Sequence, residues 1–389
     1  MTSRERFLAV MRFDPEVRAP KAEFGYWSTT LKRFIREGLP VVEPLPPDLP
    51  DNGTISGAEQ VWPGDGVVSE RNVRTCLGLD PYPAKFPIDV SPRLPEKVLE
   101  ESEEYKAYID RYGITMKVYK KGTSAPLDLA FPIAGRAEFE RYKEHYSAAE
   151  LGRRLPADWD ALARRLHSRD FPIRLGGFPF GFFGFPRHLI GSNRLFLLMY
   201  DDPQLIKDMN EFFLRFLMDY WERIIPAIRP DCVLIWEDMA SKTGSMISPA
   251  MFEEFLSPFY RRLLDFFRQH RVENILVDSD GYIEKLIPLW WELGVTGVFP
   301  IERQAGNDPL AIRRAFPRLQ MLGAVDKRVF EAGRTEADIE AELGVIARLL
   351  PGGGFVPHAD HHVPDDACWR NFRYYREGLN RLIDGSAPR

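Results

Sequence analysis

The sequence predicts an α/β fold, a (β/α)8 TIM barrel with a small β-rich insertion near its N-terminus. Short apolar runs alternate with helical patterns along most of the chain, which implies a parallel sheet with helices outside it. Roughly seven or eight such repeats favour closure into a barrel. A doubly wound open sheet is the alternative. It is weakened because no GxGxxG or P-loop pattern follows any predicted strand.

The N-terminal part sets the domain organisation. Residues 1–20 read as an amphipathic helix and a turn, without the uninterrupted apolar core of a signal peptide. Residues 41–130 are rich in proline, glycine and charge, with short alternating pieces. They predict a small antiparallel sheet that lies over one end of the main fold. The whole chain, residues 1–389, is therefore predicted to be a single barrel domain with 41–130 as an insertion or lid.

The remaining elements follow in order. The predicted barrel strands are residues 23–27, 173–177, 232–236, 274–277, 297–301, 319–324 and 355–357. The predicted helices are residues 29–37, 137–146, 148–167, 202–228, 282–291, 310–316, 336–350 and 368–383, and a further helix opens at Ser248-Pro249.

Composition excludes several classes of function. The net charge of −5 comes from interspersed acids and bases, which argues against a nucleic-acid partner. The three cysteines are far apart and show no CxxC spacing, so neither a disulfide framework nor a cysteine zinc site is expected, and a reducing cytoplasm fits. No stretch reaches the length of a membrane span. Of the ligand classes considered, a small-molecule substrate is the one that these observations leave. The oligomeric state stays open, with a homodimer among the alternatives.

The strongest local signal is the stretch NILVDSDG, residues 274–281. A short buried strand ends in Asp278 and Asp280, and a glycine and a helical pattern follow. The carboxyl ends of barrel strands are where such folds keep their chemistry. One aspartate suffices to cap a helix, so two acids at this spacing favour a functional site over a cap alone.

Other charged side chains follow the remaining strands and should meet at the same mouth. They include Glu237, Glu302, Lys327, His358 and His361. Asp278, Asp280 and His361 form a metal-ligand set, since carboxylate and imidazole groups bind zinc and other divalent ions. The alternative is a solvated acidic rim with structural ion pairs.

Aromatic residues supply candidate substrate contacts. The loop FPFGFFGFPRHLIG after the strand at 173–177 offers Phe180 and Phe183 as an apolar wall for a planar ligand, with plain core packing as the alternative. Tyr26 and Trp27 end the first predicted strand and are expected to line the same mouth.

Several stretches together resemble the uroporphyrinogen decarboxylase superfamily. They are TSRERFLAVMRF, FGYW, EGLP, ISPAMFEEFLSPFYRRL, LGAVDK and HADHHVP. The resemblance covers nearly the whole chain outside 41–130. It implies a (β/α)8 barrel and an activity from this superfamily. Members include the decarboxylase itself and methyltransferases that move methyl groups to or from a corrinoid cofactor carried on a partner protein.

Departures from the family patterns separate these branches. The decarboxylase has an arginine-rich motif of the form MRQAGRY after its first strand, and this chain has no arginine in FGYWSTT. The methyltransferases hold zinc with His-x-Cys-Gly and a later cysteine. Asp278, Asp280 and His361 stand at those three positions, so the resemblance implies zinc or another divalent metal with hard ligands. Such ligands suit activation of an oxygen rather than a thiol. The departure also leaves open that no metal binds.

The leading hypothesis is therefore a methyltransferase that demethylates an O- or N-methylated small molecule and passes the methyl group to a corrinoid protein. Asp278, Asp280 and His361 would bind the metal, Glu237 would assist as a ligand or acid, and Lys327 or Glu302 would orient the substrate. His358 is a further catalytic candidate. The alternatives are a decarboxylase or lyase of a small carboxylic acid, with Lys327 and His361 stabilising the carbanion, and a non-catalytic binding barrel.

Overall fold

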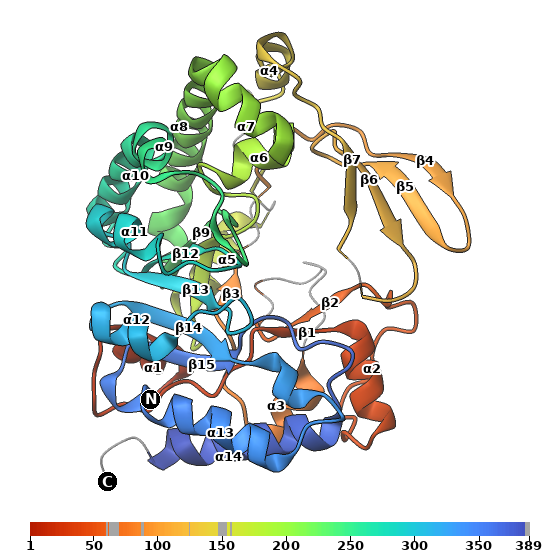
Figure 1. Ribbon diagram of the computed structural model, residues 1–389, viewed down its shortest axis with the longest axis vertical. Coiled ribbons are helices and arrows are strands. Elements are labelled where there is room, and N and C mark those ends of the chain that lie inside the picture. The colour runs from red at the N-terminus through yellow and green to blue at the C-terminus, as the bar shows by residue number, and fades with distance from the viewer. Residues whose placement is uncertain are drawn as a thin grey trace.

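A curved sheet of seven parallel strands forms most of the barrel wall in the computed structural model (Figure 1). The structure describes residues 1–59, 61, 70–86, 89–123, 125–146, 154–155 and 158–385. Around the wall the strands are β3 (Ala84–Lys85), β8 (Ile173–Gly176), β9 (Cys232–Trp236), β12 (Ile275–Asp278), β13 (Gly297–Ile301), β14 (Gln320–Val325) and β15 (Phe355–Ala359). The predicted barrel fold is confirmed.

The first strand, β1 (Gly25–Trp27), takes the eighth position between the two ends of this sheet. Tyr26 forms a parallel bridge with Val363, just after β15, and the Val363 amide donates to the Gly25 carbonyl at 2.9 Å. On its other side β1 pairs antiparallel with β2 (Thr54–Ser56). A parallel bridge between Ala58 and Tyr82 then leads to β3.

Most helices cover the outside of the barrel, whereas α1 lies across one end of it and α4 lies apart from the strands (Figure 1). The helices are α1 (Ser3–Met11), α2 (Ser28–Arg36), α3 (Arg71–Leu77), α4 (Arg136–Lys143), α5 (Trp159–His167), α6 (Gly184–Ile190), α7 (Ser192–Asp201), α8 (Pro203–Ile228), α9 (Pro249–Phe255), α10 (Ser257–Gln269), α11 (Ile287–Leu293), α12 (Pro309–Ala315), α13 (Glu336–Ala347) and α14 (Trp369–Gly385). Within the described part of the chain, none of them is both long and apolar enough to span a bilayer.

Local sequence explains where several helices begin. The Asp202 carboxylate accepts the Leu205 amide, and Pro203 occupies the first turn of α8, where no amide donor is needed. Ser248 caps α9 in the same way, as the Ser248-Pro249 pair predicts. Residues 148–153 and 156–157 of the predicted helix 148–167 lie outside the described residues, and the helix α5 occupies its end.

An apolar cluster fills the barrel interior, and α1 closes the barrel at one end. Phe7 and Met11 of α1 are buried against inward-facing side chains of the strands. The strand residues of this cluster are Cys232, Leu234, Leu276, Phe299, Leu322 and Val356. With its amino end plugged in this way, the barrel leaves its carboxyl end for a binding site.

The segment 41–130 differs from the expected insertion in one respect, because it contains the barrel strand β3. A strand of two residues has too few positions to show an alternating pattern, so the sequence did not reveal it. The expected antiparallel sheet is present as β4 (Lys97–Glu101), β5 (Tyr105–Ile109), β6 (Thr115–Tyr119) and β7 (Leu127–Ala130). It projects from the barrel beside α6 (Figure 1), and its role as a lid stays a prediction.

Candidate active site

A cavity of about 230 Å³ lies at the carboxyl ends of the barrel strands. It is lined by Phe24, Lys85, Arg174, Gly177, Phe178, Trp236, Asp278, Asp280, Phe299, Pro300 and His361. This size fits a small organic molecule.

The strand β12 brings two carboxylates into the cavity. Asp278 is its last residue, and Asp280 follows after one residue. Gly281, at φ +85°, makes this tight exit from the strand, and a Cβ there would lie 2.6 Å from the Ala240 carbonyl oxygen. The sequence DSDG therefore positions both acids and turns the chain away at once.

Burial makes both acids hard to ionise. It raises the pKa of Asp278 well above its usual value, and the neighbouring Asp280 raises it further. The pKa of Asp280 rises to about 7, through burial and then through the charges of Glu302 and Asp238. The Asp280 side chain is 42% exposed, but it faces the cavity, whose walls limit its hydration. Asp280 therefore holds a proton part of the time at neutral pH.

Two cations that the sequence did not single out line the same cavity. Arg174 comes from β8, and its guanidinium lies 5.9 Å from the centre of the Tyr82 ring. Lys85 comes from β3, and its ammonium donates to the Phe178 carbonyl oxygen at 3.3 Å. Burial and the charge of Arg174 lower the pKa of Lys85 to about 8. The one sequence feature that could have identified Arg174 as a cavity residue is that it is the only charged residue in the otherwise apolar predicted strand 173–177.

Aromatic rings form the apolar part of the wall. Phe24 packs edge-on against Phe299 at 4.8 Å between ring centres, and Phe178 packs against Trp236 at 4.7 Å. Phe178 is 47% exposed, so the cavity opens to the surface beside it. This wall can hold a flat apolar ligand.

The four aromatic residues expected at the mouth lie elsewhere. Phe180 is buried against Trp221, and Phe183 faces Phe196. Tyr26 is buried in the core, and Trp27 packs beside His362, with 6.1 Å between their ring centres, without lining the cavity. The other phenylalanine rings of the Phe/Gly loop pack against residues of α7, α8 and α10, whereas Phe178 lines the cavity.

Glu237 follows β9 but does not line the cavity. Its carboxylate accepts the backbone amides of Phe182, Phe183 and Gly184 at 2.6–3.0 Å and the Tyr260 hydroxyl at 2.7 Å. The side chain is fully buried, and this burial raises its pKa. Glu237 therefore anchors the start of α6 and the loop that carries Phe178.

The other predicted catalytic residues surround the cavity without lining it. Glu302 accepts the Gly281 amide at 2.8 Å, which fixes the turn after Asp280. Lys327 lies close enough to lower the pKa of Asp280. His358 is buried in the barrel interior, where Nδ1 donates to the Ala359 carbonyl oxygen at 2.6 Å and burial lowers its pKa to about 3.

The three predicted metal ligands all line the cavity, but they do not form a ligand group. His361 Nε2 lies 3.8 Å from Asp280 Oδ2, and burial lowers the pKa of His361 to about 4, so its ring is neutral. Among the described residues, no three histidine, cysteine or carboxylate groups are placed to hold one ion. The donor set as arranged therefore does not fit a zinc site, which takes at least three protein ligands.

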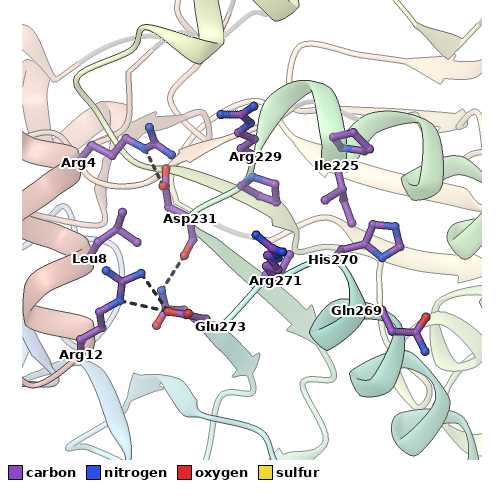
Figure 2. Close-up of a pocket in the computed structure, with 14 residues that line it drawn as sticks. Arg4, Leu8, Arg12, Ile225, Arg229, Asp231, Gln269, His270, Arg271 and Glu273 are labelled. Atoms are coloured by element: carbon purple, nitrogen blue, oxygen red, sulfur yellow. Dashed lines mark hydrogen bonds and ion pairs between the residues drawn. The ribbon is translucent and has the colours of Figure 1, made fainter.

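Figure 2 shows a second cavity, of about 760 Å³, at the opposite end of the barrel. Arg4 of α1 pairs with Asp231 at 2.8 Å, and Arg12 pairs with Glu273 at 3.1 Å. Asp231 and Glu273 precede β9 and β12, so this cavity lies at the amino ends of the strands. Since barrels carry their chemistry at the carboxyl ends, we place the candidate site in the smaller cavity.

Comparison with known proteins gives one family. A family model described as uroporphyrinogen decarboxylase (URO-D) matches residues 110–376, more than half of the chain. No curated protein matches the sequence significantly. Among solved structures, a methyltransferase from Methanosarcina mazei is similar over 99% of both chains, with a TM-score of 0.58 and 15% identity.

A second solved structure is more distant. It is a B12-independent methionine synthase from Shewanella sp. W3-18-1 in complex with selenomethionine. The likeness covers 75% of this chain and 74% of that chain, with a TM-score of 0.38 and 10% identity. At that level it bears on neither fold nor function, whereas the likeness to the Methanosarcina protein supports the barrel fold.

Proposed function

The chain belongs to the uroporphyrinogen decarboxylase (URO-D) family, and we propose that it is a methyltransferase acting on a small O- or N-methylated molecule. The observation that carries the proposal is the pair Asp278 and Asp280 beside His361 in a small, aromatic-walled cavity. The fold likeness to a methyltransferase along the full length of both chains supports this branch of the family.

Asp280 has the central role in this reaction. When a methyl group leaves an oxygen or nitrogen, the heteroatom takes up the bonding electron pair and needs a proton. A carboxylic acid with a pKa near the working pH is suited to donate it. The neutral ring of His361 lies next to Asp280, with 3.8 Å between Nε2 and Oδ2. In the tautomer protonated on Nε2, a closer His361 would donate to the carbonyl oxygen of the acid and leave the acid proton for the substrate.

The methyl group itself needs an acceptor. We propose a corrinoid on a partner protein, which supplies a strong nucleophile for the methyl carbon when it is bound. The opening of the cavity at the half-exposed Phe178 gives such a partner access to the substrate. This chain contributes the binding cavity, the orientation of the substrate and the proton.

The proposal is tested with free cob(I)alamin as the methyl acceptor. The purified protein is mixed with small methoxy and methylamino compounds, and methyl transfer is followed by the change in corrinoid absorbance. We expect enzyme-dependent transfer from at least one compound. Absence of transfer from all of them, together with release of CO2 from a small acid, would contradict methyl transfer and favour decarboxylation.

The second candidate function is decarboxylation or another lyase reaction of a small carboxylic acid. It is favoured by Lys85 and Arg174, because two cations in the cavity can hold a carboxylate and stabilise a carbanion formed beside it. Both candidates use the same cavity and differ in the bond that breaks.

Chelation should not affect activity. Because the described residues provide no group of three ligands, we expect dialysis against EDTA to leave methyl transfer and thermal stability unchanged. Elemental analysis of the protein before and after dialysis checks the result. Stoichiometric zinc, with activity that disappears on chelation and returns with added zinc, would show instead that the cavity rearranges around a metal.

Uroporphyrinogen should not be a substrate. No arginine lies in the stretch 24–30 after the first strand, so the cations that would grip the carboxylates of the tetrapyrrole are missing there. We expect no product by chromatography of the reaction mixture. Turnover at roughly one per second or faster, within the usual enzyme range, would contradict the assignment of this site.

A further inference from the structure

We propose that Arg174 and Lys85 form a binding site for a carboxylate group, so that the ligand of this cavity is a small planar organic acid. The inference names the substrate class of the same site, and it rests on the proposed function for the statement that this acid is methylated. Neither residue carries a role in the family motifs that the sequence displays, and the two reach the cavity from neighbouring strands, β3 and β8.

The first argument is that both cations lack a carboxylate partner among the described residues. Arg174 makes no ion pair there, and its Nε is buried without a hydrogen-bond partner. Lys85 has only the carbonyl oxygen of Phe178 at 3.3 Å. Arg174 is half-buried, and such a cation is normally paired because removing it from water is costly. Lys85 is exposed along its side chain and adds a second positive charge to the lining of the cavity. A ligand that brings an anion would supply the missing partner.

The second argument is the contrast with the other cations near the mouth. Arg187 pairs with Asp238 at 2.5 Å and lies over the Trp236 ring, and Arg303 pairs with Glu342 at 3.1 Å. These side chains have their charge balanced within the protein. Arg174, Lys85 and Lys327 make no ion pair among the described residues, and of these three only Arg174 and Lys85 line the cavity. Asp278 is near enough to act on the charge of Lys85, but no carboxylate of the described residues forms an ion pair with either cation.

The third argument is the distribution of chemistry around the cavity. The cations come from β3 and β8, whereas Asp278, Asp280 and His361 come from β12 and the segment after β15. Rings of Phe24, Phe178, Trp236 and Phe299 line the same cavity. A flat molecule with a carboxylate at one end and a methylated heteroatom at the other satisfies both polar regions at once.

Electrostatics allows an anion despite the two aspartates. Burial raises the pKa of Asp278 well above its usual value, which favours its neutral form, and the pKa of Asp280 rises to about 7. The net charge of the cavity is therefore positive or close to neutral when Lys85 and Arg174 are charged. A carboxylate is attracted there, whereas a phosphate dianion would add a second charge close to the acids.

The test is isothermal titration with pairs of ligands that differ in charge alone. 4-Methoxybenzoate is compared with 4-methoxybenzamide, and methoxyacetate with methoxyacetamide. We expect at least one acid to bind about tenfold or more tightly than its amide, because hydrogen bonds to charged groups are the stronger ones. The preference should weaken as the pH rises through about 8, where Lys85 loses its charge.

Variants assign the preference to the two cations. Arg174→Gln and Lys85→Met should each reduce the affinity for the acid by about tenfold and leave that for the amide nearly unchanged. Lys85→Arg keeps the charge and should retain the preference without its loss near pH 8, which keeps the test decisive if another variant fails to fold. Arg348→Gln, on the outside beyond α13, is the matched control and should behave as the wild type.

The outcomes separate this inference from the proposed function. Acid-selective binding that depends on Arg174 supports the carboxylate site even if no methyl transfer is ever observed. Methyl transfer from a neutral compound, with equal binding of acids and amides, would keep the methyltransferase and overturn the carboxylate site. Failure of both acids to bind below about 10 mM would also overturn it, since that is weaker than ordinary substrate affinity.

Discussion

Replacing Asp280 with asparagine is expected to slow methyl transfer by about 10²- to 10⁴-fold, the usual contribution of a positioned general acid. The substitution keeps the shape of the side chain but removes the proton that the leaving heteroatom needs. Stability should barely change, because among the described residues no hydrogen bond reaches the Asp280 carboxylate and its nearest basic group is His361, 3.8 Å away. The rate is measured with cob(I)alamin, and the thermal midpoint is measured on the same sample.

The pH dependence gives the sharper test of this role. The protonated form of Asp280 is the active one, so kcat/KM should fall as the pH rises through about 7. This decline should be absent from the residual activity of Asp280→Asn. Glu302→Gln removes the neighbouring charge that raises the pKa of Asp280, so the decline should move to lower pH. Because the acids interact, the measured value belongs to the group as a whole.

A matched control accompanies these variants. Asp201→Asn removes an exposed carboxylate at the end of α7 and should leave both the rate and its pH profile as in the wild type. If Asp280→Asn keeps the rate within tenfold, or keeps the decline near pH 7, Asp280 is not the acid. A binding barrel without activity predicts neither effect.

Replacing Glu237 with alanine is expected to cost about 3 kcal/mol or more in the free energy of unfolding. The change leaves three buried backbone amides and the Tyr260 hydroxyl without their acceptor, and each unsatisfied buried group costs about 1–3 kcal/mol. The loop that carries Phe178 should loosen with it, so substrate affinity should also fall. Denaturant titration measures the first effect, and titration with ligand measures the second.

Glu237→Gln distinguishes an anchor from a catalytic acid. Glutamine fills the same space but offers one acceptor oxygen and turns an NH2 group toward amide donors, so it should destabilise the fold by less than alanine does. A catalytic acid would instead lose activity at unchanged stability. Glu254→Ala, which removes an exposed ion pair with Lys207, should stay within about 0.5 kcal/mol of the wild type. A Glu237→Ala variant as stable as this control would rule out the anchor.

Much of the barrel could be read from the sequence. Strands such as Cys232–Trp236 are continuous apolar runs because both faces of a parallel sheet are covered, and that pattern is local. The same logic brought Asp278, Asp280 and His361 to one cavity from two distant parts of the chain. Parallel strands that share a direction have their carboxyl ends at one edge, so position along a strand was enough.

The sequence by itself could not decide which side chains reach the ligand. Lys85 lies on a strand of two residues inside the segment 41–130, too short to show a pattern. Phe178 and Phe180 are two residues apart in the same loop, yet one lines the cavity and the other packs against Trp221. The direction of a side chain in a loop depends on contacts with distant segments, and no local period encodes it.

The tertiary structure also decided the roles of the acids. Glu237 follows a buried strand and Asp278 ends one, so their positions in the sequence do not distinguish their roles. Three amides and a hydroxyl surround Glu237 and make it an anchor, whereas Asp278 faces the cavity. The sequence determined that carboxylates gather at the mouth of a barrel. Only the packing of loops around them decided which acid has its hydrogen-bonding capacity satisfied within the protein and which acid faces the cavity. The reason is that hydrogen-bond partners come from segments far apart in the chain.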